Sequence, residues 1–460
     1  MSHPEVEKKE PGEKLTLFTL SWPILVEFFL MMLMGMADTF MLAHVSDDAV
    51  AAVGLSNQII SMAIVMFNFV AIGSAVVVAQ YLGAKRVNEV GQISAASITL
   101  NFLWGLMISL VFILFSTQLL GLMDVPPQLL GDASHYLAIV GSTLFFQAIL
   151  STASAIIRAN GYTRDAMLVS IGMNVIHVIG NYLFIFGALG VPQLGVTGVA
   201  ISTVISRGLA TIVMMVLLYR RVPVKIEWID YIKWKAAHLR NILKIGVPSA
   251  GEHLSYESSQ IMCTAFIATL GASALATKVY TQNIMYFVLL FSLAIGQGTE
   301  ILVGHLIGAG KIKEAYKQLI RSLQVSFTVT IVVVLAVALF REQLLGIFTN
   351  NSAIIQLGGI LLLSCIVLEP GRTFNLVVIN SLRAAGDAQF PVIMGILSMW
   401  GISVPVSYLL GIHYEMGLLG FWIAFALDEW VRGVMMYIRW KSRAWEKKAL
   451  VKPAVQVADV

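Results

Sequence analysis

The segment LTLFTLSWPILVEFFLMMLMGMADTFMLAH, residues 15–44, decides the fold class of this chain. It is almost wholly apolar but contains two acids, Glu27 and Asp38, and the sequence has no Lys or Arg between Lys14 and Lys85. A run of about 20 apolar residues is enough to cross a bilayer as a helix. The whole chain is 58% hydrophobic and 12% charged, whereas soluble proteins average about 25% charged residues. Because lipid offers no partners for backbone polar groups, we expect an all-α polytopic membrane protein.

Similar apolar runs recur along the chain, and the sequence predicts twelve transmembrane helices. Several runs exceed the length that a perpendicular helix needs, so we expect tilted helices or helix ends that lie in the interface. The predicted spans are residues 15–44, 50–81, 93–117, 131–157, 166–188, 195–219, 242–270, 275–306, 318–340, 353–382, 391–412 and 416–438.

Lys and Arg are distributed unevenly between the two sides of these spans. If the N-terminus is cytoplasmic, 25 of the 30 Lys and Arg residues fall on the inner side, and the outer loops keep only Lys278 and Arg341. Cytoplasmic loops of membrane proteins carry such an excess. We therefore expect a multi-pass protein of the cell membrane, plasma or bacterial inner, with both termini in the cytoplasm. The same bias accounts for the net charge of +4 without a nucleic-acid partner.

The chain divides into two related halves around one long polar linker, YRRVPVKIEWIDYIKWKAAHLRNILK, residues 219–244. A shift of 225 residues places Glu27 on Glu252 and Arg158 on Arg383, and it also pairs prolines and glycines of the two halves. Six spans in each half make the halves parallel repeats, and such pairs commonly enclose a central cavity. The predicted parts are a cytoplasmic segment 1–14, an N-lobe 15–219, a cytoplasmic linker 220–241, a C-lobe 242–438 and a cytoplasmic tail 439–460.

Five motifs in this order on twelve spans resemble the multidrug and toxic compound extrusion (MATE) family over about residues 15–440. They are MADTFMLAH in the first span, VAQYLGAKR after the second, RANGYTRDA between the fourth and fifth, VPQLGVTGVAIST into the sixth and LRAAGDAQFPV before the eleventh. The resemblance implies two six-helix lobes that form a V. It also implies antiport, in which inward movement of Na⁺ or H⁺ drives the export of cationic and amphipathic organic compounds. Polysaccharide and lipid-precursor flippases of the same superfamily are similar in outline.

Asp38 is the first candidate for coupling to the ion. A carboxylate near the centre of a bilayer costs about 2.5–3.5 kcal/mol on insertion scales, so such residues usually face a cavity and have a function. Either protonation or binding of Na⁺ would remove its charge, and its position matches the acidic residue of the family's first span. Asn174, His177 and Asn181 lie on one helical face of the fifth span, and they are its expected partners. The family often has Asn and Asp where this chain has His177 and Asn181. A proton relay built on those family residues therefore cannot be assigned to this chain without change.

The second half holds more charged residues within its spans. Acids in this lobe match the region where sodium-coupled relatives place a cation site, and either Glu252 or Glu257 of the seventh span fits the prominent Glu of that site. The equivalence of Glu27 and Glu252 also fits a shared structural role. Glu300 is a candidate for the cavity wall. Internal ion pairs are the simpler interpretation of the spacing within two further sets, Glu369 with Arg372 and Asp428 with Arg432.

Substrate contacts and helix bending are predicted from the first span. Met31, Met34 and Met41 recur on the Asp38 face of the helix, and thioethers adapt easily to substrates of varied shape. Ordinary packing explains any single methionine equally well. Pro23 removes one backbone hydrogen bond and can bend the helix; it matches a proline that the family resemblance links to bending.

Other classes of protein have little support in the sequence. It contains no P-loop, HExxH, CxxC or GxSxG motif, so an enzyme or an ATP-driven pump is disfavoured. A flippase for lipid-linked saccharide or peptidoglycan precursors is the main alternative, and it would need several free cations in the cavity; the intramembrane candidates are Arg207, Arg372 and Arg432. We expect a monomeric secondary transporter with no cofactor other than H⁺ or Na⁺ as the coupling ion, with Na⁺ held at Asp38 or at Glu252 or Glu257.

Overall fold

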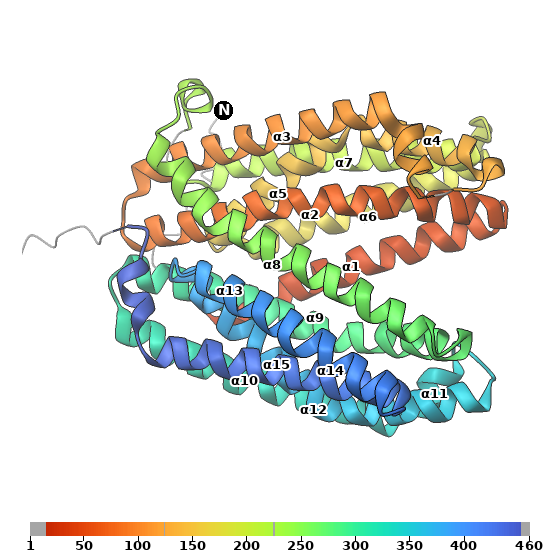
Figure 1. Cartoon of the computed structure of the whole chain (residues 1–460). Helices are drawn as coiled ribbons and strands as arrows, with labels where there is room; N and C mark the ends of the chain where they lie inside the picture. The colour runs from red at the N-terminus through yellow and green to blue at the C-terminus, as the bar shows by residue number, and fades with distance from the viewer. Residues whose placement is uncertain (1–14, 124, 224–225, 452–460) are drawn as a thin grey trace, which may run out of the picture.

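The structure is a computed structural model that describes residues 15–123, 125–223 and 226–451. These residues form helices and connecting turns, without a strand among them. The long helices run roughly side by side in two groups, which Figure 1 shows one above the other. We name the upper group, α1–α7, the N-lobe and the lower group, α8–α15, the C-lobe.

The N-lobe contains seven α-helices. Several of their ends are fixed by local capping: Ser46 accepts a hydrogen bond from the backbone of Ala49 at 3.0 Å at the start of α2, and Gly187 ends α6 in the left-handed region. The bounds are α1 Leu17–Ala43, α2 Asp47–Gly83, α3 Val87–Gly121, α4 Pro127–Gly141, α5 Leu144–Ala159, α6 Thr163–Phe186, the short η1 Ala188–Gly190 and α7 Gly195–Arg221.

The C-lobe follows after the short helix η2, Trp228–Tyr231. One of its helices is interrupted by two π-helical segments, η3 and η4. The bounds are α8 Ala236–Ala268, α9 Ala272–Gly308, α10 Ile312–Leu339, α11 Arg341–Gly346, α12 Ser352–Ala384, α13 Gln389–Ser398, η3 Met399–Ser403, α14 Val404–Tyr408, η4 Leu409–His413, α15 Gly417–Lys441 and η5 Ala444–Lys448.

Nine helices of the described chain are long and apolar enough to cross a membrane, and the bent pair α4 and α5 makes a tenth span. The two remaining long helices, α8 and α15, have 33 and 25 residues. Their sequences are less apolar because each carries several charged side chains, which in α15 are Asp428, Glu429, Arg432, Arg439 and Lys441. With these two, the twelve predicted spans each have a helical counterpart in a two-lobe, all-α membrane fold.

Three details differ from the sequence-based expectation. The fourth span, 131–157, is broken by a 48° bend between α4 and α5, because residues 142–143 leave the helix. The eleventh span, 391–412, contains the two π-helical segments. Helical structure also extends into the predicted linker 220–241 at both ends, because α7 continues to Arg221 and α8 begins at Ala236; α15 likewise runs on to Lys441.

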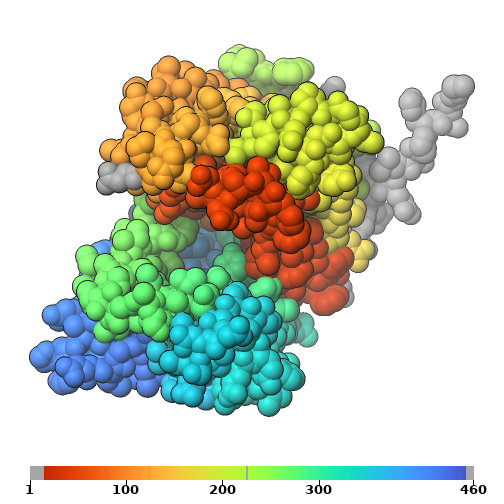
Figure 2. All heavy atoms as spheres, turned by 90° about the vertical axis from the view of Figure 1, so that its right-hand side faces the viewer, coloured from red at the N-terminus to blue at the C-terminus, as the bar shows by residue number. Residues whose placement is uncertain are grey.

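The two lobes meet at one end of the bundle and separate at the other. At the end where α2 and α9 finish, a methyl group built on Gly83 would overlap the carbonyl oxygen of His305, and one built on Gly308 would overlap that of Gln80. We name this the closed end. At the opposite end, Figure 2 shows a hollow between the N-lobe above and the C-lobe below. We name it the open end; the turns that join α1 to α2 and α8 to α9 lie there.

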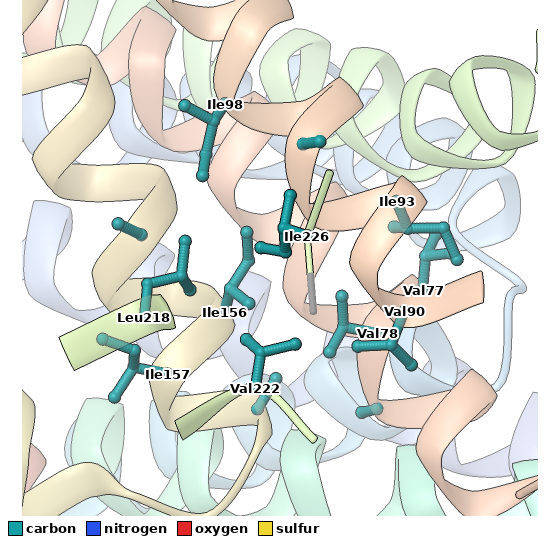
Figure 3. Packing of buried hydrophobic residues seen from close by; sticks show 14 of the residues in the cluster. Val77, Val78, Val90, Ile93, Ile98, Ile156, Ile157, Leu218, Val222 and Ile226 are labelled. Carbon is teal, nitrogen blue, oxygen red and sulfur yellow. The ribbon is translucent and has the colours of Figure 1, made fainter. Parts of the chain in front are cut away.

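Most buried apolar residues cluster within one lobe, although a smaller cluster joins α1 to α9. The largest cluster lies mainly in the N-lobe near the closed end and also includes Ile242 of α8. It joins α2, α3, α5 and α7 through residues such as Val77, Ile93, Ile156 and Leu218, as Figure 3 shows. Val222, in the segment after α7, is buried in the same cluster. Such packing makes each lobe a rigid unit, since buried side chains interdigitate as closely as in organic crystals.

Candidate functional site

A hydrogen-bonded group of polar side chains lies within the N-lobe around Asp38 of α1. His177 and Asn181 of α6 approach the same carboxylate oxygen, Oδ1, each at 2.6 Å through Nε2 and Nδ2. The exposed fractions are 8% for Asp38, 1% for His177 and 0% for Asn181. The structure thus brings Asp38, His177 and Asn181 into direct contact. Asp38 lies only five residues before the end of α1, which places it towards the open end.

The group continues from α6 to α7 through two serines. The Ser202 hydroxyl donates to the His177 carbonyl oxygen at 2.8 Å, and the Ser206 hydroxyl lies 3.4 Å from His177 Nδ1. With a proton on Nε2, His177 donates to Asp38 and accepts from Ser206; with both nitrogens protonated, it donates to both. His177 can therefore carry a second ring proton, on Nδ1, while it keeps its hydrogen bonds to Asp38 and to Ser206.

Two further polar residues lie near this group, and the sequence analysis did not connect them with it. Tyr136 of α4 is 2% exposed and donates to Asn57 of α2 at 3.2 Å. Arg207 of α7 is half-buried and lies near Tyr136 and Asp38, close enough for electrostatic interaction with the Asp38 carboxylate. It forms no ion pair with any of the described residues. Nothing in the local sequence around Tyr136 could have found it, because α4 meets α7 only in the fold.

The predicted cavity residues of the N-lobe are less concentrated. Asn174 is half-buried and donates to the Ser170 carbonyl oxygen of its own helix at 2.8 Å, so it adds no contact to Asp38. Met31 is 57% exposed, Met34 is half-buried, and Met41 packs against the buried core of the lobe. Met41 therefore has a packing role, whereas Met31 and Met34 keep accessible thioethers.

The C-lobe holds a buried network of five charged side chains on α12 and α15. Glu369 pairs with Arg372 at 2.6 Å, and Asp428 pairs with Arg432 at 2.8 Å, which confirms the two ion pairs expected from the spacing. Glu429 joins the pairs, because its Oε1 lies 3.0 Å from Arg432 and 3.5 Å from Arg372. The carboxylates are thus matched with guanidinium groups, which reduces the cost of burying them in the membrane.

Glu252 has a partner that the repeat relationship predicts. Arg383 lies 2.5 Å from Glu252 in the C-lobe, and the equivalent Arg158 lies 2.6 Å from Glu27 in the N-lobe. Two copies of one ion pair at equivalent positions favour the shared structural role over a separate cation site at Glu252. Glu257 points elsewhere: its side chain is 58% exposed and its nearest charged neighbour is His253, at 3.9 Å. The two glutamates therefore do not form one site.

The remaining predicted residues are Glu300 and Pro23. Glu300 of α9 is half-buried, has one oxygen atom without a hydrogen-bond partner and lies in the field of both Arg383 and Arg158. Glu300 therefore interacts electrostatically with the arginine of each of the two repeat-related ion pairs. Helix α1 runs from Leu17 to Ala43 without a break at Pro23.

Comparisons with known proteins agree with this arrangement. The sequence profile of the family MatE matches residues 23–183 and 248–409, one match in each half. The chain is 47% identical to "Uncharacterized transporter YisQ" of Bacillus subtilis, with 96% of this chain and 97% of that protein covered. It is 28% identical to "Probable multidrug resistance protein NorM" of Thermotoga maritima, with 97% and 96% covered.

The fold is similar to that of a solved structure described as "Crystal structure of MATE in the bent conformation". The TM-score is 0.86, the sequence identity is 19%, and 94% of this chain and 96% of that chain are covered. The family match in both halves and the transporter relatives define a membrane transporter rather than an enzyme. The chain belongs to the MatE family, whose members are multidrug efflux transporters that carry small organic compounds across a membrane.

Proposed function

We propose that this protein is a secondary antiporter that exports organic cations and exchanges them for protons entering through the N-lobe. The observation that carries the proposal is the buried contact between Asp38 and His177. A buried carboxylate with only neutral or exchangeable partners changes its charge when it takes up a proton, and the electrostatic balance of the lobe changes with it. One charge that moves inward across about 100 mV supplies about 2.3 kcal/mol, which is enough to bias the two lobe arrangements.

The donor set around Asp38 supports a proton over Na⁺. Hard cations prefer several oxygen ligands. Here the carboxylate faces an imidazole nitrogen and an amide nitrogen, neither of which is an oxygen ligand that Na⁺ prefers. In the C-lobe, Glu252 and the acids of α12 and α15 already face arginines. These contacts favour H⁺ as the coupling ion.

The orientation follows from the basic residues. The turns at Lys85–Arg86 and Lys311–Lys313 lie at the closed end, and cytoplasmic loops are the ones enriched in Lys and Arg. We therefore assign the closed end to the cytoplasm and the hollow of Figure 2 to the outer side. In this arrangement Asp38 is near the outer opening, where protons enter.

The alternative of a flippase for lipid-linked saccharides has less support. A pyrophosphate group would require several cations in the cavity that are free to bind it. Arg372 and Arg432 are both paired with acids, so of the three intramembrane candidates only Arg207 lacks an ion pair within the described part of the chain. An acidic first span fits a cationic substrate better.

Reconstituted protein in liposomes tests the proposal with ethidium as the cationic probe. An inward pH gradient should drive ethidium exchange in wild type and in Asp47→Asn, which removes an exposed acid at the start of α2. Asp38→Asn should abolish the exchange. Exchange driven by a Na⁺ gradient alone would overturn the choice of proton. Absence of ethidium movement under either gradient, from folded protein that translocates a lipid-linked saccharide, would establish the flippase instead.

A further inference from the structure

We propose that the segment after α15, residues 443–451, is a strap that ties the C-lobe to the N-lobe and holds the closed end shut. This inference rests on the proposed alternation of the two lobes and adds to it the element that controls which arrangement is populated. We name residues 443–451 the strap.

The strap is anchored to the C-lobe at its beginning. Arg443 adopts a left-handed backbone conformation with φ of 57°, which turns the chain sharply after α15. Trp445 then stacks on Trp440 of α15 with ring centroids 4.1 Å apart, and its Nε1 donates to the Trp440 carbonyl oxygen at 2.8 Å. Both indole side chains are fully buried in the C-lobe. This part of the strap therefore moves with α15.

The end of the strap is buried in the other lobe. Val451 is 4% exposed and belongs to the apolar cluster of the N-lobe shown in Figure 3, together with Val77, Val78 and Val222. The strap thus begins in the core of one lobe and ends in the core of the other. Burial of a valine side chain favours this docked arrangement by about tenfold or more.

Leu450 connects the strap to both lobes at the same point. Its backbone N–H donates to Gln80 Oε1 of α2 at 2.8 Å, while Gln80 Nε2 donates to the Ala384 carbonyl oxygen at the end of α12, at 2.6 Å. The Leu450 side chain also packs with Ile245 of α8 and Ala388 of the segment before α13. One glutamine side chain therefore bonds to the strap and to a C-lobe helix together.

These contacts cannot all persist when the closed end opens. Separation of α2 from α12 breaks the bond between Gln80 and Ala384, and the strap is too firmly fixed at Trp445 to follow the N-lobe. Val451 must then leave its apolar cluster. The strap therefore adds a cost to the inward-open arrangement that does not depend on the substrate or on the coupling ion.

Interlobe distances in the full-length protein test the strap. Asn88→Cys and Lys313→Cys, 225 residues apart in the first turns of α3 and α10, are exposed at the closed end and accept spin labels. The native Cys263 and Cys365 are buried and remain unlabelled. Pulsed electron paramagnetic resonance in liposomes then reports the ratio of longer to shorter distances between the lobes.

Val451→Asp should raise that ratio about tenfold, because a carboxylate cannot remain in an apolar cluster. Leu450→Pro removes the N–H that donates to Gln80 and shortens the side chain that packs with Ile245 and Ala388, so it should raise the ratio about threefold. Ala449→Asp places the same carboxylate on an exposed residue of the strap and should match the parent protein. If Val451→Asp does not yield folded protein, Leu450→Pro decides the matter.

A parent-like ratio in Leu450→Pro and in folded Val451→Asp would overturn the strap. Ethidium exchange by the parent protein, measured in the same liposomes, separates this result from a failure of the proposed function. Intact exchange with unchanged distances rejects the strap alone. Absent exchange in the parent rejects the proton-coupled antiport, whatever the distances show.

Discussion

Gln80 and His305 are equivalent residues of the two halves, and each bonds across the closed end to the equivalent carbonyl oxygen of the opposite lobe. Gln80 Nε2 donates to Ala384 at 2.6 Å, and His305 Nε2 donates to Ala159 at 2.7 Å. All four residues obey the 225-residue shift seen in the sequence. The interface between the lobes is therefore built twice from one pattern, as expected for parallel repeats related by an axis along the membrane normal.

These crossed bonds predict a difference between two substitutions of His305. His305→Gln preserves a side-chain donor of the kind that the equivalent position already uses, so it should retain thermal stability close to wild type. His305→Leu leaves the buried Ala159 carbonyl oxygen without a partner, which costs about 1–3 kcal/mol. Thermal unfolding of the purified protein in detergent checks this order. Equal unfolding temperatures for the two variants would mean that the bond does not hold the lobes together.

The N-lobe relay predicts different roles for Asp38 and His177. Asp38→Asn should abolish pH-driven ethidium exchange, because an amide cannot change charge. His177→Gln should lower exchange by about tenfold or more and leave ethidium binding in place, because glutamine can donate to Asp38 but cannot carry an extra proton. Exchange and equilibrium binding of ethidium, measured on the same preparations, separate the two effects. A loss of binding in His177→Gln equal to the loss of exchange would contradict a role in proton transfer.

Part of this site was predictable from sequence and part was not. The shared face of His177 and Asn181 follows from helical spacing, and the pairs Glu369–Arg372 and Asp428–Arg432 follow from it in the same way. Ser206, Tyr136 and Arg207 lie on α7 and α4, and their approach to Asp38 depends on how α1, α4, α6 and α7 pack together. No local pattern encodes such contacts between distant helices.

The interlobe contacts show the same limit. The repeat aligned Gln80 with His305 and Ala159 with Ala384, but it did not reveal that these pairs cross between the lobes. The strap has still less signal, because its apolar residues, Trp445, Leu450 and Val451, lie within or directly after a short charged stretch that resembles an ordinary cytoplasmic tail. The break between α4 and α5 is not predicted either, since Ser142 and Thr143 are a short polar pair within a run that is long and apolar enough for one helix.

The repeat-related ion pairs predict a stability effect without a change in coupling. Glu252→Gln leaves the guanidinium of Arg383 without its carboxylate partner, and such a loss within a protein interior typically costs about 3–5 kcal/mol. The double variant Glu252→Gln with Arg383→Gln removes both charges and should recover most of that stability. Thermal unfolding of the single and double variants measures the recovery. If the double variant were as unstable as the single one, the unpaired charge of Arg383 would not be the cause of the instability, and the prediction would be wrong.

The same variants distinguish structure from ion coupling at Glu252. Folded protein with Glu252→Gln and Arg383→Gln should still exchange ethidium under a pH gradient, because the proposed relay lies around Asp38. The corresponding N-lobe variant, Glu27→Gln with Arg158→Gln, should behave alike, since its ion pair has the same geometry. Loss of pH-driven exchange in the C-lobe variant alone would show that Glu252, and not Asp38, couples transport to the proton.

The C-lobe network predicts that its members are unequal. Arg432 lies between Asp428 and Glu429, so Arg432→Leu leaves two buried carboxylates facing each other and should be strongly destabilising. Glu429→Gln keeps both remaining pairs, Glu369–Arg372 and Asp428–Arg432, and should cost much less. Unfolding temperatures in detergent give the order directly. The prediction fails if Glu429→Gln is the more damaging of the two.

Close approach of α2 and α9 predicts that two glycines set how tightly the closed end shuts. Gly83 faces the His305 carbonyl oxygen and Gly308 faces that of Gln80, in both cases too closely for a methyl group. Gly83→Ala and Gly308→Ala should therefore each separate α2 from α9. Each should increase the fraction of molecules in which the lobes are apart at the closed end. Gly121→Ala has open space around it at the other end of α3 and serves as the control. Distances between labels at Asn88→Cys and Lys313→Cys measure the change. Because the two contacts are equivalent, the two variants should shift the distance ratio by similar amounts; a shift in only one of them would show that the lobes do not close symmetrically.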